Sequence, residues 1–199
     1  MSKGRDSDEL LLRLEQSARP VTEITAHSRN PGIYGFFLLK GSLRIGQRSC
    51  SAGPRTLLYL GKTKSSQKAR DAGEHLADGQ TGRSTLRRSL GALLREQLNL
   101  DPRPRSGSEK SDHRFTNFKF DPRGERELTN WMRKHLGLGF FELTIADLEG
   151  SEKSVIASAM PPLNIQNNSK SPNREELEVA REQCSCMARE WERSRPKDA

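Results

Sequence analysis

Residues 32–39 have the sequence Gly-Ile-Tyr-Gly-Phe-Phe-Leu-Leu, and residues 56–61 have the sequence Thr-Leu-Leu-Tyr-Leu-Gly. Both are short apolar runs flanked by glycine, proline and polar residues, which is typical of buried β-strands. We expect the two strands to pair antiparallel, with the irregular segment 40–55 as their connection. The chain has only two tyrosines, Tyr34 and Tyr59, and both lie in these runs. Taken alone they are most simply core aromatics. Two phenol groups on paired strands are also candidates for residues of a catalytic site.

The bulk composition fits one domain with an appendage. The chain has 199 residues, of which 32% are hydrophobic and 30% charged, so much of it must face solvent. No apolar run approaches the ~20 residues that a membrane span needs, and charges within residues 5–9 interrupt any secretory leader. We therefore expect a cytoplasmic protein with no membrane partner. An odd count of three cysteines, Cys50, Cys184 and Cys186, is expected to give reduced thiols rather than disulfides or a zinc site.

The positive charge of the chain is unevenly distributed. The formal net charge is +8, and residues 55–105 hold 11 Lys and Arg against 5 Asp and Glu. Residues 147–199 hold 8 basic residues against 10 acidic ones. A local surplus of this kind favours an anionic partner, most simply nucleic acid, over a generic solvated face.

Helical periodicity and capping residues predict most of the remaining elements. The helix from Ser84 or Thr85 has a leucine stripe that should face the core. A polar surface loop is expected over 101–112, and the C-terminal helix either packs back on the domain or serves a partner helix. The expected helices lie at 7–18, 65–77, 84–98, 125–136, 147–160 and 173–191, with a short strand at 116–120 and a third sheet strand at 140–145.

Glu152 is a carboxylate on the apolar side of its predicted helix. It lies four residues after Leu148 and four before Ile156, which belong to that side. Burying a carboxylate is costly unless it is paired or binds a metal. Position alone leaves two interpretations open: a metal ligand, or an edge carboxylate bonded to an arginine or a backbone amide.

The loop over 79–85 has two glycines, small hydroxyl side chains and a helix N-terminus directly after it. Such a loop suits a phosphate, and the residues expected to contact one are Thr81, Ser84, Arg87 and Arg88. An ordinary interhelical connection with Ser84 as the cap explains the same pattern.

Arg70 and His75 follow the second strand on a predicted helix. An arginine can hold a phosphate oxygen, and a neutral imidazole can accept a proton near pH 7. The simpler alternatives are an ion pair of Arg70 with Glu74 and a surface position for His75.

Taken in order, these residues resemble the GIY-YIG nuclease domain, over Pro31 to about Asn164. The closing motif is the most specific part, because the family has a glutamate on a helix that ends at Pro-x-x-Asn, and the loop and helix over 81–91 resemble a bacterial branch of that family. The matching positions are Gly32-Ile33-Tyr34, Tyr59-Leu60-Gly61-Lys62, Arg70, His75, Glu152, Pro161 and Asn164.

The resemblance implies an α+β fold with a small antiparallel sheet of about three strands flanked by helices, followed by a C-terminal amphipathic helix. It also implies the domain organisation. An N-terminal helical extension covers 1–30, the nuclease domain covers 31–166 with an insertion loop at 100–123, and a linker with the C-terminal helix covers 167–199.

The implied activity is endonucleolytic hydrolysis of DNA with one Mg²⁺ or Mn²⁺. Glu152 would be the metal ligand and Tyr34 the general base, and a phenol with a pKa near ~10 needs a nearby cation for that role, for which we expect Lys62. Tyr59 would orient water or hold phosphate. Arg70 would stabilise the charge of the transition state, His75 would be a further catalytic residue, and Asn164 would contribute to substrate binding or fix the helix of Glu152.

One departure from the family pattern concerns spacing. Arg70 and His75 are five residues apart, whereas the family usually has four, and five residues turn a regular helix about 140° past alignment. Two functions of other classes therefore stay open beside the nuclease: a non-catalytic nucleic-acid-binding module of the same fold, and a scaffold that acts through its C-terminal helix. The sequence also leaves the oligomeric state open.

Overall fold

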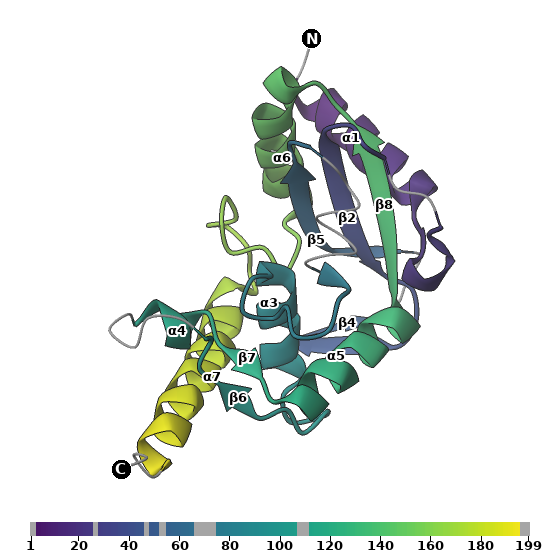
Figure 1. Ribbon diagram of the computed structural model, residues 1–199. Helices are drawn as coiled ribbons and strands as arrows, with labels where there is room; N and C mark the ends of the chain where they lie inside the picture. Colours follow the sequence, from purple (N-terminus) through teal and green to yellow (C-terminus); the bar gives the residue numbers. More distant parts are fainter. Residues whose placement is uncertain are drawn as a thin grey trace.

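A four-stranded antiparallel sheet forms the centre of the molecule (Figure 1). The structure is a computed structural model that describes residues 3–25, 28–45, 48–51, 55–65, 75–106 and 112–195. The strand order is β1-β8-β2-β5, so β5 lies at an edge. The predicted fold class and the antiparallel pairing of the first two apolar runs are confirmed. The strands are β1 (Arg19–Pro20), β2 (Gly32–Leu38), β5 (Thr56–Thr63) and β8 (Leu136–Glu142).

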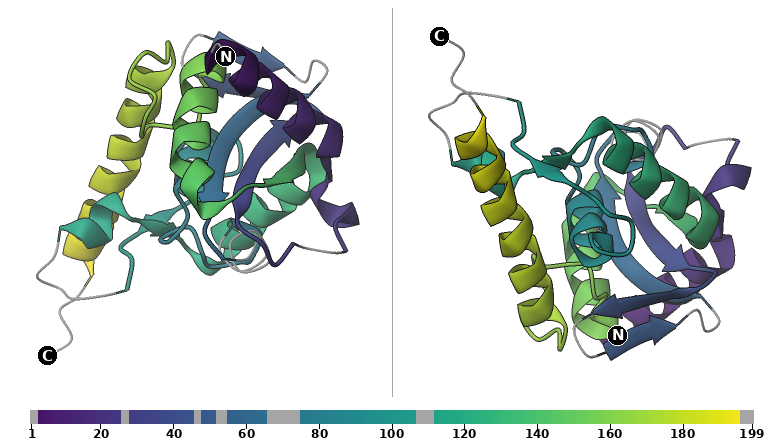
Figure 2. Two further views of the ribbon diagram at one scale, coloured as in Figure 1. Left: turned by 90° about the horizontal axis from the view of Figure 1, so that it is seen from above. Right: turned by 90° about the horizontal axis from the view of Figure 1, so that it is seen from below.

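Helices cover both faces of this sheet (Figure 2). One face packs against α1 (Lys3–Ser17) and α6 (Ile145–Ala159). On this face Ile33 and Phe37 of β2 pack against residues of these two helices. The opposite face carries Tyr34 and Phe36 and packs against α3 (Thr85–Leu94) and α5 (Pro122–His135). Because side chains alternate along a strand, the continuous apolar run of β2 supplies both cores at once.

A β-bulge interrupts the pairing of β2 with β5. Phe36 lies opposite Tyr59, and Phe37 lies opposite Leu57, so Leu58 is the extra residue. Leu58 and Tyr59 consequently join the same hydrophobic core, on the side of α3. Bulges turn the side chains of a strand relative to the regular alternation. This one turns Leu58 toward the face that Tyr59 already shares with Tyr34 and Phe36.

Two sequence-based boundaries were wrong. The third strand begins at Leu136 rather than at 140, directly after the helix, so Gly137 and Gly139 lie inside the strand. A Cβ atom at Gly139 would come within 2.1 Å of the Leu14 carbonyl oxygen, so the glycine allows α1 to approach the sheet. In addition, Thr144 rather than Asp147 caps α6.

The segment predicted as a surface loop over 101–112 is in part structural. β6 (Pro102–Arg103) pairs with β7 (Lys119–Phe120), and α4 (His113–Thr116) lies between them in the chain. Phe118 and Phe120 are buried in the core formed by α3 and α5. The insertion therefore extends the hydrophobic core, and its polar composition concealed this contribution.

The C-terminal helix α7 (Arg174–Ser194) packs back on the domain. It contacts α3, α4 and β6, and Leu177, Cys184 and Ala188 are buried along its inner face. Burial raises the pKa of the Cys184 thiol to about 12, whereas Cys186 is exposed. The side chain of Cys50 and most of the helix predicted over 65–77 lie outside the described residues.

The other described elements are short. They are the one-turn helix η1 (Val21–Glu23) and the hairpin of β3 (Ser42–Ile45) with β4 (Arg48–Ser51), which is formed by the segment that connects β2 to β5. In the ranges that the structure describes, no helix has both the length and the apolar character to cross a membrane.

Candidate active site

A cleft of about 610 Å³ opens at the edge strand β5. Its walls come from β2, β5, the first residue of α3, α6 and the loop that follows α6. Three lysines and two glutamates lie among thirteen lining residues, which makes the cleft polar and slightly basic. The lining residues are Tyr34, Tyr59, Gly61, Lys62, Thr63, Lys64, Ser65, Thr85, Glu149, Glu152, Lys153, Gln166 and Asn167.

The hydroxyl group of Tyr34 is hydrogen-bonded to His75. The distance from Tyr34 Oη to His75 Nε2 is 2.9 Å, and His75 Nδ1 lies 2.7 Å from Ser84 Oγ. Ser84 also accepts a hydrogen bond from the Arg87 backbone N–H, as the N-cap of α3. All three side chains are buried. The imidazole is thus held from both sides, with one nitrogen directed at the phenol.

Gly61 makes room for the Tyr34 ring. The two residues are directly opposite in the β2–β5 ladder, and a Cβ atom at Gly61 would lie 2.4 Å from Tyr34 Oη. The phenol therefore lies across β5 and reaches His75 on the far side. This contact gives a steric reason for a glycine at position 61, two residues before the end of β5.

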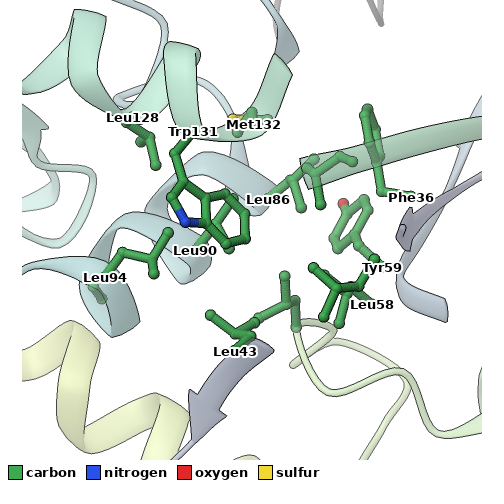
Figure 3. Packing of buried hydrophobic residues seen from close by; sticks show 14 of the residues in the cluster. Phe36, Leu43, Leu58, Tyr59, Leu86, Leu90, Leu94, Leu128, Trp131 and Met132 are labelled. Atoms are coloured by element: carbon green, nitrogen blue, oxygen red, sulfur yellow. The ribbon is translucent and has the colours of Figure 1, made fainter. Parts of the chain in front are cut away.

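Tyr59 lies next to Tyr34 on the same face. Their ring centroids are 6.4 Å apart, and the Tyr59 ring packs beside Leu58 near Leu86 of α3 (Figure 3). Each tyrosine ring contributes to the core and its side chain also forms part of the cleft wall, so the core interpretation is confirmed, while a role in chemistry stays a prediction.

Glu152 and Lys62 form an ion pair on the other side of β5. Their Oε2 and Nζ atoms are 2.7 Å apart, and their side chains are 13% and 26% exposed. Lys62 lies opposite Ile33 in the ladder, so it points toward α6, whereas Tyr34 points toward α3. The expectation that Lys62 pairs with the Tyr34 phenol is thus wrong, because strand alternation separates them.

Asn164 holds the edge strand. Its Oδ1 accepts from the Leu60 N–H and its Nδ2 donates to the Leu60 carbonyl, each at 2.8 Å. Asn168 Nδ2 in turn donates to the Asn164 carbonyl oxygen. The Asn164 side chain is buried and both ends of its amide are used, so it fixes β5 to the segment after α6 rather than contacting a substrate.

Arg87 and Thr81 are interior groups. The Arg87 side chain is 0% exposed, and its Nη2 lies 2.8 Å from Glu125 Oε2. The Thr81 hydroxyl donates to the same carboxylate oxygen at 2.8 Å and accepts from Arg87 Nε at 3.1 Å. Burial lowers the pKa of Arg87, and the Glu125 charge opposes that shift. The expectation that Arg87 and Thr81 bind substrate phosphate is therefore wrong, because neither reaches the surface.

Ser84 and Arg88, which were also expected to contact a phosphate, are both buried but lie close to the cleft. Ser84 is buried and engaged as the cap and as the partner of His75. Arg88 is 7% exposed and donates to Thr85 Oγ1, a residue of the cleft wall. Arg70 lies outside the described residues, so its role stays a prediction.

Glu125 and Thr85 were not singled out from the sequence. Glu125 lies three residues before Leu128 and seven before Met132, at the spacing of the buried face of α5, so its burial is a signal that the sequence contains. Thr85 reaches the cleft only because α3 begins beside β5, and local sequence carries no signal for that.

A carboxylate of this kind suits a hard divalent cation. The Glu152 carboxylate is mostly shielded from solvent and already holds a positive charge, the Lys62 ammonium. Magnesium is commonly bound through one or two carboxylates, with water and substrate phosphate completing the shell. Within the described part of the chain no group of three or more metal-ligating side chains occurs, so a cage built from protein alone does not fit.

Comparison with known proteins identifies one family. A family model described as the GIY-YIG catalytic domain matches residues 43–183, which is more than half of the chain. No curated protein and no solved structure matches it. The matched range includes β5, α3, α6 and α7 as far as Gln183, and it begins after β2.

Proposed function

The chain belongs to the GIY-YIG catalytic domain family, and on this premise we propose that it is a metal-dependent endonuclease that hydrolyses phosphodiester bonds of DNA. The observation that supports this most is the gathering of Tyr34, Tyr59, Lys62 and Glu152, from three separate elements, around one polar cleft. The basic surplus of residues 55–105 provides the attraction for a polyanion.

Tyr34 is proposed as the general base, with His75 as its partner. His75 Nε2, at 2.9 Å from Tyr34 Oη, accepts the phenol proton, and the resulting phenolate takes a proton from the attacking water. The water oxygen then bonds to phosphorus, the bond from phosphorus to the 3′ oxygen breaks, and solvent protonates the leaving oxygen. The bond to Ser84 orients the imidazole for this transfer.

Glu152 is proposed as the protein ligand of a Mg²⁺ or Mn²⁺ ion. When bound there, the cation supplies Lewis-acid polarisation of the phosphate and stabilises charge on the leaving oxygen. Lys62 orients the carboxylate until then, through the 2.7 Å ion pair. Tyr59 orients water or phosphate, and Arg70 stabilises the charge of the pentacovalent phosphate.

The decisive experiment is a cleavage assay with the full chain. We expect supercoiled plasmid to be nicked and linearised with Mg²⁺ or Mn²⁺ and to stay intact with EDTA. Single-stranded and branched DNA are assayed in parallel, since specificity is not predicted. Metal-independent binding without cleavage of any of these substrates would identify a non-catalytic binding module instead.

Tyr34→Phe is expected to lower the rate of cleavage about 10²-fold, which is typical of losing a general base. The ring still fills the space over Gly61, but loss of the buried hydrogen bond to His75 should lower stability by about 1–3 kcal/mol, so the rate is measured well below the unfolding transition. The measurement is the single-turnover rate against pH, where the limb that reports the base should disappear. Tyr59→Phe is the comparison variant on the same face. A Tyr34→Phe rate equal to that of the unsubstituted chain would remove Tyr34 as the base.

A further inference from the structure

Arg88 is a buried cation without a carboxylate partner. Its Nη1 donates to the Thr81 carbonyl at 3.2 Å and its Nη2 donates to Thr85 Oγ1 at 3.2 Å, both neutral acceptors. Its Nε atom is buried and has no hydrogen-bond partner. A buried charge is costly unless an opposite charge compensates it. The described part of the chain provides Arg88 with no ion pair.

A second arginine lies near the first, on α7. Arg181 follows Leu177 by four residues and precedes Cys184 by three, which places it on the inner face of α7 that packs against α3. Within the described ranges it also forms no ion pair. The negative charge of Glu178 acts on Arg181, but the Glu178 carboxylate forms its ion pair with Arg174, at 2.7 Å.

The positive charge of Arg181 acts on Arg88, and both arginines are close enough to Tyr59 for its charge to act on them. Burial, followed by the charge of Arg181, lowers the pKa of Arg88 to about 10, while Tyr59 acts in the opposite direction. Burial also lowers the pKa of Arg181, while the charges of Glu178 and then Tyr59 act in the opposite direction. Arg105, which donates to the Gly82 carbonyl, adds a third positive charge that acts on Arg88.

This cluster adjoins the cleft. Thr85, which accepts the hydrogen bond of Arg88, lines the cleft together with Tyr59. Arg88 therefore lies next to the part of the cleft wall that Thr85 forms, and the α3–α7 contact brings Arg181 to the same side of α3, with no ion pair for either arginine among the described residues. An anion bound there would relieve their repulsion, and a strand of nucleic acid carries such anions at a regular spacing.

From this arrangement we propose that Arg88 and Arg181 form a subsite for a backbone phosphate of the nucleic acid, next to the cleaved phosphate. The inference rests on the proposed function, since it assigns a second contact to the same substrate. It makes α7 part of the substrate-binding surface, in addition to its packing role. Arg181, as the more exposed of the two, contacts the phosphate, and Arg88 supports it with charge.

The test measures DNA binding without cleavage. A fluorescent DNA duplex is titrated with the full chain in EDTA, by fluorescence anisotropy, from about 50 to about 200 mM salt. For Arg181→Gln we expect a Kd about 10-fold higher and a slope of log K against log salt that is smaller in magnitude by ~0.9, the value for one lost phosphate contact. Arg181→Lys, which keeps the charge, should retain the slope.

Arg193→Gln is the matched control, because it removes one exposed charge from the same helix. Its Kd and slope should stay close to those of the unsubstituted chain. The thermal midpoint of Arg181→Gln separates the subsite from a packing role, since loss of a repelled cation should leave stability equal or higher. An unchanged slope in Arg181→Gln overturns the subsite even if the chain cuts DNA. Absence of cleavage with a reduced slope overturns the nuclease proposal alone.

Discussion

Replacing Glu152 with glutamine is expected to lower the rate of metal-dependent DNA cleavage by about 10³-fold, since the loss of metal-based charge stabilisation is worth several kcal/mol and each ~1.4 kcal/mol is a factor of ten. Glutamine keeps the shape of the side chain and can still accept a hydrogen bond from Lys62. The fold should therefore be unaffected, and the effect should appear in the rate of the chemical step. Single-turnover cleavage at saturating protein gives that rate directly.

The same variant should bind DNA as tightly as the unsubstituted chain or more tightly. The Glu152 carboxylate now neutralises Lys62 at 2.7 Å in the cleft, and its removal leaves that cation available to phosphate. Weaker cleavage with equal or stronger binding separates a catalytic carboxylate from a structural one. Binding in EDTA, by the anisotropy assay described above, provides the second measurement.

Glu127→Gln serves as the control for the loss of one negative charge, because Glu127 is exposed on α5, away from the cleft. Its cleavage rate should stay within about twofold of the original, as for most surface substitutions. Undiminished cleavage by Glu152→Gln would reject this carboxylate as the metal ligand, and with it the proposed mechanism.

The fold was largely predictable because local patterns decided it. The apolar run of β2 supplies two cores and cannot be mistaken for a solvated loop, and Ser84 caps α3 as its sequence indicates. The start of β8 was missed because glycines usually end helices, whereas Gly139 is needed for the approach of α1. That need arises from a helix more than a hundred residues away, so no local signal reveals it.

The site was predictable in its residue types and less so in its contacts. The resemblance supplied Tyr34, Tyr59 and Glu152, and all three line one cleft. The partner of Lys62 depended on which face of β5 it occupies, and its place opposite Ile33 directs it to the α6 face, where Glu152 lies. The spacing of His75 argued against a place in the site, yet the imidazole contacts Tyr34 directly.

Arg87 was misassigned for a reason that concerns α3 as a whole. The leucine stripe of this helix left Arg87 off the expected core face, as on a surface helix. In the structure α3 contacts α7 and β3, and its leucines share a core with the sheet and α5, so eight of its ten residues are buried. Periodicity identifies one buried face well, but it does not reveal a helix that is covered on all sides.

Arg87→Met is accordingly expected to destabilise the fold by about 3–5 kcal/mol, the usual cost of removing one partner of a buried ion pair. Methionine fills part of the space but leaves the Glu125 carboxylate with only the Thr81 hydroxyl and the Phe120 N–H as donors. It also removes the hydrogen bond from Arg87 to the backbone carbonyl of His75, the residue that contacts Tyr34. Unfolding in urea, followed by circular dichroism, measures the free energy.

Two further variants show whether the ion pair is the cause. Arg133→Met removes an exposed arginine of α5 and should change stability by no more than about 0.5 kcal/mol. Arg87→Met combined with Glu125→Gln removes the orphaned charge, so the double variant should be more stable than the sum of the single effects predicts. Below its unfolding transition, Arg87→Met should bind DNA with an unchanged Kd, because the guanidinium is inside the protein. Full stability together with weakened DNA binding would instead restore Arg87 as a phosphate contact.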